Sequence, residues 1–173
     1  MGTLKFRDLT AEEIECRVGH ITSKGLSLLL YKNARVDCTI LDETVGPMSW
    51  QNTYSRDNQN CTVSIWDDEK KQWISKENTG TESNTEKEKG LASDSFKRAC
   101  FNWGIGRELY SAPFIWIKKE LCNIESDGGR YVCRDKFKVE KILIEDKKII
   151  AISIINQSTG KRVYIWQAER AKR

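Results

Sequence analysis

The chain has few of the residues on which metal and nucleophile chemistry depends. It contains one histidine, His20, and six cysteines, none of which belongs to a C-x-x-C pair. Zinc sites use closely spaced Cys or Cys/His ligands, so the sequence predicts no metal site and no cofactor. The cysteines are better interpreted as small hydrophobic residues of a core. Because nothing marks a partner for His20, we expect no catalytic residue and no enzyme activity.

Membrane and targeting signals are also missing. No apolar run reaches the roughly 20 residues of a membrane-spanning helix. The first residues, MGTLKFRDLTAEEI, are charged and have no apolar segment of the kind found in secretory signals. We therefore expect a cytoplasmic protein with no membrane partner. A G-x-x-x-x-G-K-[ST] sequence is absent too, which argues against a P-loop ATPase.

The composition is that of an ordinary globular domain. Of 173 residues, 39% are hydrophobic and 31% are charged, which is enough for a single core. The formal net charge of +4 permits a nucleic-acid partner without requiring one. The tryptophans and tyrosines could stack on bases. We nevertheless expect Trp66, Trp103 and Trp116 in the core, because each stands in an apolar pattern.

Alternating and helical patterns predict an α+β chain in the order β-β-α-β-β-β-α, with an antiparallel sheet packed on a long helix. A small three-stranded β meander is expected near the C-terminus. We place the core at residues 1–117 and the C-terminal β element, with its basic tail, at residues 118–173. A loop at Ser126-Asp127-Gly128-Gly129 favours a boundary in this region. The expected strands are Glu15 to Thr22, Leu26 to Tyr31, Ser49 to Tyr54, Cys61 to Trp66, Gln72 to Glu77, Phe137 to Ile144, Lys148 to Asn156 and Val163 to Trp166.

Glycine and asparagine mark the ends of the helices. Asn33 is a suitable N-cap for a helix from Ala34 to about Thr44, which Gly46-Pro47 would end. The second strand is nearly continuous in leucine, so we expect it to be buried on both faces.

The stretch from Thr85 to Tyr110 predicts one long helix. Thr85 and Glu88 fit a capping box, and Gly104 supplies a stop. Apolar residues recur at helical spacing, while Lys97 and Arg98 lie near the centre of the helix. A surface helix with charges for solubility, and with Asp94 and Arg98 as an i,i+4 ion pair, is the simplest interpretation. The apolar stripe consists of Leu91, Ala92, Phe96, Ala99, Cys100 and Trp103.

Two segments carry a resemblance to a known family. ARVDCTILDETVGPMSW and EKEKGLASDSFKRACFNWG, in this order of predicted elements, resemble the Rad-fifty-two family of single-strand DNA annealing proteins, and look closest to its short bacteriophage members. The likeness spans roughly residues 10–110. Its most specific part is Ser93-Asp94-x-x-Lys97-Arg98-Ala99, supported by Arg35-Val36, Gly46 and Trp50.

The resemblance implies an oligomeric ring whose basic groove binds single-stranded DNA by its backbone and anneals complementary strands without ATP, in homologous recombination and repair. It also implies a bacterial host cell, with host or phage recombination proteins as candidate partners. By position in the family motif, Lys97, Arg98, Arg17 and Lys89 would contact DNA. Eukaryotic members have a further arginine where this chain has Phe101, and Arg107 is the candidate replacement.

Two other classes of function stay open. One is a divalent-metal nuclease that uses acids such as Asp67, Asp68 and Asp94, although consecutive acids in a predicted turn more often serve the turn itself. The other is an interaction scaffold in which the apolar stripe of the Thr85 to Tyr110 helix forms an oligomer interface and DNA plays no part.

Overall fold

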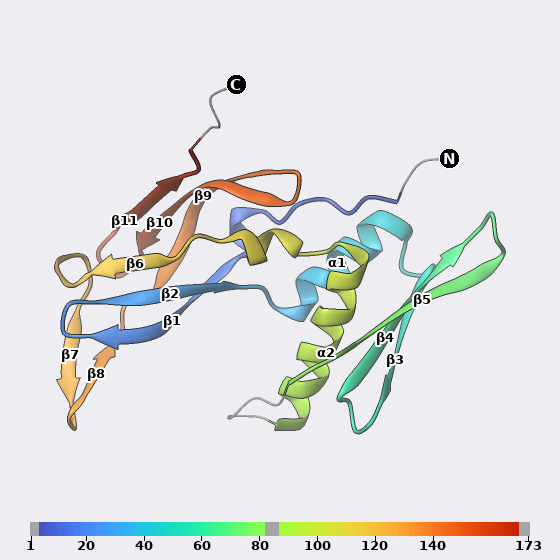
Figure 1. Cartoon of the computed structure of the whole chain (residues 1–173), viewed down its shortest axis with the longest axis horizontal. Helices are drawn as coiled ribbons and strands as arrows, with labels where there is room; N and C mark the ends of the chain where they lie inside the picture. The colour runs from blue at the N-terminus through green and yellow to red at the C-terminus, as the bar shows by residue number, and fades with distance from the viewer. Residues whose placement is uncertain (1–3, 82–86, 170–173) are drawn as a thin grey trace. The chain divides into compact units, whose positions relative to one another are not determined.

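The computed structural model describes residues 4–81 and 87–169, except for the side chains of residues 87–89. These described residues form an α+β structure with two α-helices and antiparallel sheets, which confirms the α+β class in its general form (Figure 1). Its elements are η1 (Ala11–Glu13), β1 (Glu15–Thr22), β2 (Gly25–Tyr31), α1 (Ala34–Val45), β3 (Trp50–Ser55), β4 (Asn60–Asp67), β5 (Gln72–Thr79), α2 (Lys87–Trp103), η2 (Arg107–Ser111), β6 (Ile115–Lys118), η3 (Lys119–Leu121), β7 (Ile124–Asp127), β8 (Arg130–Cys133), β9 (Phe137–Glu145), β10 (Lys148–Asn156) and β11 (Lys161–Gln167).

The chain forms two compact units, each built from two segments. Unit 1 comprises the described residues of Met1–Asp8 and Asn33–Gly106, and unit 2 those of Leu9–Lys32 and Arg107–Arg173. This differs from the expected division after residue 117, which falls within β6. Hydropathy patterns identify strands but not their neighbours in a sheet, so the sequence did not reveal that early and late strands share one sheet.

In unit 1, α2 packs on the antiparallel sheet β3-β4-β5. The period-two pattern of β4 directs Cys61, Val63 and Ile65 to one face, where all three are buried. On the same face Trp50 of β3 lies with its ring centroid 6.1 Å from that of Phe96 of α2. The core of unit 1 thus fixes which side of α2 faces the sheet.

Helix α1 begins and ends as the sequence predicts. The side chain of Asn33 accepts a hydrogen bond from the backbone N–H of Arg35 at 2.9 Å. At the other end Gly46 has a φ of 86° and donates its N–H to the carbonyl of Asp42. A side chain would be strained at this φ, so glycine suits the position.

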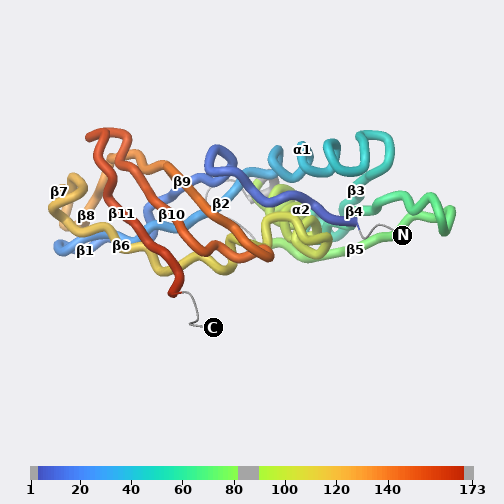
Figure 2. The backbone as a smooth tube through the Cα atoms, turned by 90° about the horizontal axis from the view of Figure 1, so that it is seen from above, coloured from blue at the N-terminus to red at the C-terminus, as the bar shows by residue number. Residues whose placement is uncertain are grey.

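In unit 2, six strands form one sheet in the order β11-β10-β9-β1-β2-β6. Strands β9, β10 and β11 make a meander, seen from above in Figure 2. They join the β1-β2 hairpin through a single residue pair, Glu15 with Lys138. The edge strands β11 and β6 lie near each other. The hydroxyl of Tyr164 on β11 donates to the carbonyl of Phe114, just before β6, at 3.2 Å. The meander is therefore part of a larger sheet and not the separate small element that the sequence suggested.

Helix α2 is shorter than the predicted helix over Thr85 to Tyr110. It ends at Trp103, and Gly104 follows with a φ of 104°, as expected of a glycine stop. Residues Arg107–Ser111 form the separate 3-10 helix η2. The predicted capping box depends on Thr85, which lies outside the described residues.

One further local prediction is wrong, and another holds only in part. Leu29 of β2 is 47% exposed, so β2 is not buried on both faces. The loop expected at Ser126 to Gly129 is the turn of the β7-β8 hairpin, in which Ile124 pairs with Cys133. Short strands flanked by glycines carry too few apolar residues for a periodic signal to appear.

Candidate nucleic-acid interface on helix α2

Helix α2 separates its apolar residues from its charged ones. Leu91, Phe96, Ala99 and Cys100 are buried in unit 1. Asp94, Lys97 and Arg98 are each partly exposed. Most of the apolar stripe is therefore covered within the unit, which argues against the oligomer interface that the scaffold alternative requires.

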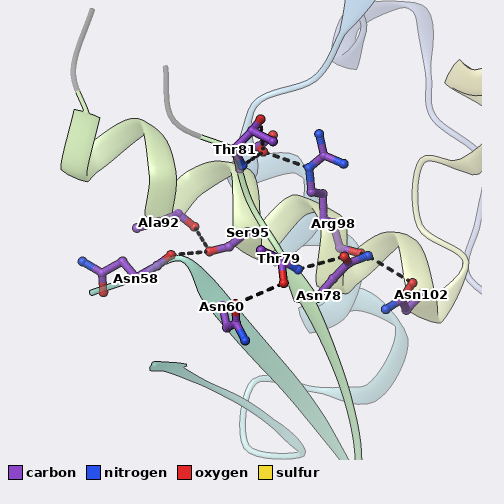
Figure 3. A network of polar contacts seen from close by, with 10 residues as sticks. Asn58, Asn60, Asn78, Thr79, Thr81, Ala92, Ser95, Arg98 and Asn102 are labelled. Carbon is purple, nitrogen blue, oxygen red and sulfur yellow. Dashed lines mark hydrogen bonds and ion pairs between the residues drawn. The ribbon is translucent and has the colours of Figure 1, made fainter. Parts of the chain in front are cut away.

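Arg98 is held in a defined orientation by Asp94. Its Nε donates to Oδ2 of Asp94 at 2.8 Å, one helical turn back. The same oxygen accepts the backbone N–H of Thr81 at 2.9 Å and the Thr81 hydroxyl at 3.3 Å. Figure 3 shows Thr81, just beyond the end of β5, beside the Arg98 side chain. The predicted i,i+4 pair therefore exists, and it is tied to the segment that follows β5.

The electrostatics of Asp94 follow from these contacts. Burial raises the pKa of its carboxyl group. The hydrogen bonds from Thr81 and Arg98, together with the charges of Arg98 and Lys97, outweigh this effect and keep the pKa below its ordinary value of 3.8. Asp94 is thus ionised at neutral pH and can orient the guanidinium.

Residues of β5 hold the C-terminal half of α2. Nδ2 of Asn78 donates to the carbonyl of Arg98 at 3.1 Å, and Nζ of Lys76 donates to the carbonyl of Asn102 at 3.0 Å. Nδ2 of Asn102 in turn donates to the carbonyl of Glu77 at 2.9 Å. A cation at the last carbonyls of a helix also complements the helix dipole. This β5 network fixes the backbone from which Lys97 and Arg98 project.

Gly80 lets the chain pass close to α2. A Cβ atom on Gly80 would lie 2.7 Å from the backbone nitrogen of Ser95 and 3.0 Å from the carbonyl oxygen of Leu91. Ser95 is itself fully buried, and its hydroxyl donates to the carbonyl of Asn58 at 2.9 Å. The close approach brings Thr81 to Asp94, so it contributes to the placement of Arg98.

Sequence reasoning missed Thr81, Lys76, Asn78 and Asn102 as supporting residues. Thr81 and Asn78 both lie in the polar run NTGTESN, which has the composition of a turn and no pattern that indicates a contact with a helix. The orientation of Lys76 and Asn78 towards α2 follows only from the register of β5, and that of Asn102 from the packing of α2.

Lys97 differs from Arg98 in its contacts. It is partly exposed, and among the described residues its side chain makes no hydrogen bond or ion pair. Its charge contributes to the lowered pKa of Asp94. An ammonium group that is not engaged in an ion pair keeps its attraction for an external anion such as a phosphate.

The other predicted DNA contacts fall elsewhere. Lys89 belongs to α2, but its side chain lies outside the described part of the structure. Arg17, on β1, and Arg107, at the start of η2, are exposed and belong to unit 2. The structure thus brings Lys97 and Arg98 together on one element, and it describes Arg17 and Arg107 in a different unit.

The acids proposed for the nuclease alternative have local roles. Oδ1 of Asp67 accepts the backbone N–H groups of Glu69 and Lys70, each at 3.0 Å, as expected for a turn residue. The bond from the Lys70 N–H is the largest cause of a lowered pKa of Asp67, and the bond from Glu69 acts in the same direction. Oδ1 of Asp68 accepts the indole N–H of Trp66 at 3.0 Å. Within residues 4–81 and 90–169, no three His, Cys, Asp or Glu side chains form a group that could hold a metal ion.

Other predictions about individual residues have mixed outcomes. Trp66, Trp103 and Trp116 are half-buried and not fully in the core. Trp103 donates its indole N–H to the carbonyl of Val63 at 3.0 Å, which explains its position at the edge of the α2 interface. Cys61 and Cys100 are buried as expected, whereas the other four free cysteines are only partly covered. His20 is exposed.

Comparison with protein-family models, with curated proteins and with solved structures finds no match to this chain. Neither α-helix in the described part of the chain has the length and apolar content that crossing a bilayer requires.

Proposed function

We propose that this protein binds single-stranded DNA through Lys97 and Arg98 and anneals complementary strands without a nucleotide cofactor. The observation that carries the proposal is the arrangement on α2, where Asp94 and Thr81 orient Arg98 beside the partly exposed Lys97. Adjacent cations on a fixed helix suit a chain of phosphates, whose negative charge dominates the affinity of most DNA-binding proteins. The family resemblance of the Ser93 to Ala99 motif supports the same assignment.

Under this proposal, Ala99, Asp94 and Arg98 of the Ser93 to Ala99 motif each have a physical role. Ala99 is fully buried, so a larger residue would push α2 away from its packing partners. Asp94 removes rotamer freedom from Arg98 before DNA arrives, which lowers the entropic cost of binding. Phe101, where the family's eukaryotic members have a further arginine, would leave this groove less basic.

Annealing needs no hydrolysis. Two DNA strands repel each other through their phosphates, and bound cations reduce this repulsion. Base pairing then returns about 1.4 kcal/mol per base-pair step. In the proposed ring, many copies of the same cation pair would act on one strand, which raises the avidity above that of a single subunit with a net charge of +4. Arg17 and Arg107, which belong to unit 2, are proposed as further contacts of the DNA backbone.

The test combines annealing with particle imaging. Complementary oligonucleotides labelled with a fluorophore and a quencher should pair faster with the protein than without it, in a buffer free of ATP. Images of the purified protein with and without single-stranded DNA should show a closed ring with the DNA in a groove. An unchanged annealing rate over a range of protein concentrations, with no binding at low salt, would refute the proposal.

A further inference from the structure

Strand β6 of unit 2 presents aromatic side chains on an outer face. Ile115 and Ile117 point into the core and are 1% and 0% exposed. Since side chains alternate along a strand, Trp116 and Lys118 point the other way. Phe114 immediately precedes β6, and its ring lies against that of Trp116. Phe114 is 76% exposed, which is unusual for an aromatic residue in a folded domain. No feature of the proposed site on α2 explains it.

Strand β2 has small residues next to these rings. Ser27 pairs with Trp116, and Gly25 pairs with Lys118. A Cβ atom on Gly25 would lie 2.8 Å from the indole ring of Trp116, so the indole rests directly on the glycine backbone. The sequence therefore makes room for a ring to lie across β2.

The rings of Phe114 and Trp116 form a near-parallel pair. The centroids of Phe114 and Trp116 are 6.3 Å apart, and their planes are within 19° of parallel. Leu29, on the same face of β2, is 47% exposed and extends the apolar area towards β1. Near-parallel rings offer π faces with a common stacking direction, as in the sheets that bind single-stranded nucleic acids.

Cations surround this surface. Arg17 of β1 lies directly across from Leu29 in the sheet register and is exposed. Lys118 follows the rings on β6, and Lys24, also exposed, precedes Gly25 at the hairpin turn. The carboxylate of Glu15 at the other end accepts a hydrogen bond from the Tyr31 hydroxyl at 2.6 Å. The charge around the rings is therefore mainly positive, which favours a polyanion over a second apolar surface.

We propose that the outer face of β1, β2 and β6, here named the aromatic platform and defined by Phe114, Trp116, Leu29, Arg17 and Lys118, binds the unpaired bases of single-stranded nucleic acid by stacking. The cations contact the flanking phosphates. This inference rests on the proposed function and adds a base-dependent contact to the backbone contact of α2. Bases already paired in a duplex cannot stack on the platform, so it distinguishes single strands from duplexes.

The test compares a deoxythymidine 20-mer with an abasic 20-mer that has the same phosphate charge. Phe114→Ala should weaken binding of the thymidine strand by about 5-fold or more, because one base loses its stacking partner. Binding of the abasic strand should not change. Tyr131→Ala, which removes another exposed aromatic ring from unit 2, is the matched control and should leave both affinities unchanged.

The outcomes separate the platform from the site on α2. If Lys97→Ala with Arg98→Ala weakens both strands while Phe114→Ala binds thymidine as tightly as the unmodified protein, the platform is refuted and the proposed function stands. If the unmodified protein binds neither strand, both are refuted. If Phe114→Ala disrupts assembly and leaves the preference for bases intact, the face is a contact between copies and the platform is refuted.

Discussion

Nε of Arg98 donates to Oδ2 of Asp94 at 2.8 Å, within a single turn of α2. Thr81, which follows β5, donates its backbone N–H to the same carboxylate oxygen. A surface ion pair of this spacing stabilises a helix by only a few tenths of a kcal/mol. Its larger effect here is geometric, because it connects a DNA-contact candidate to a fixed point outside the helix.

Asp94→Asn should destabilise the fold by about 1 to 2 kcal/mol, because the N–H of Thr81 and the guanidinium of Arg98 lose a charged acceptor. Urea unfolding followed by circular dichroism measures the change. Asp68→Asn is the control, since that carboxylate is 86% exposed and should contribute less than about 0.5 kcal/mol. Equal stabilities of the two variants would show that Asp94 does not fix this part of the unit.

Gly80→Ala should lower stability by about 1 to 3 kcal/mol, since the added Cβ would lie 2.7 Å from the backbone nitrogen of Ser95. Backbone atoms of a packed helix cannot move aside as a flexible side chain does. Thermal unfolding provides the measurement, and Gln72→Ala, at the exposed start of β5, is the control. If the variant is as stable as the unmodified protein, the close contact between Gly80 and α2 does not contribute to stability.

Because of Glu140, unit 2 should become less stable at acid pH. Hydrogen bonds from Arg162 and Ser153 lower the pKa of its carboxyl from 4.5 to about 2. The folded-state pKa is depressed, so the stabilisation is present above pH 4.5 and is lost as the pH falls towards about 2. Unfolding curves measured across this pH range should show that Glu140→Gln loses less stability on acidification than the unmodified protein does.

Glu145→Gln provides the control for that pH experiment. Glu145 lies at the end of the same strand, and among the described residues its side chain makes no hydrogen bond. Its substitution should leave the loss of stability at acid pH the same as in the unmodified protein. If Glu140→Gln and Glu145→Gln behave alike, the ion pair between Glu140 and Arg162 does not couple stability to pH.

The sequence predicted local structure better than long-range placement. The α1 cap at Asn33 and the alternation around Val63 depend on neighbouring residues, so both could be recognised directly. The joining of β9 to β1 through Lys138 and Glu15 depends on partners more than a hundred positions apart, for which no local pattern exists. Sequence patterns therefore identified most of the strands, missed the β7-β8 hairpin, and assigned some strands to the wrong substructure.

The candidate site shows the same division. Lys97 and Arg98 were identified from their motif, and Asp94 from its helical spacing. The role of Thr81 required knowledge of where β5 ends, and the close approach at Gly80 could not be distinguished in sequence from an ordinary turn glycine. The exposed ring of Phe114 was hidden for a related reason, because an aromatic residue in an apolar segment normally indicates a core position.

The salt dependence of single-stranded DNA binding tests the central claim most directly. Lys97→Ala with Arg98→Ala should weaken binding and reduce the magnitude of the slope of log Kobs against log salt by about 0.7 per lost phosphate contact. Lys70→Ala with Lys161→Ala removes the same charge from exposed positions and should leave the slope unchanged. A folded Lys97 and Arg98 double variant with unaltered affinity and slope would contradict the assignment of α2 as the DNA-binding element.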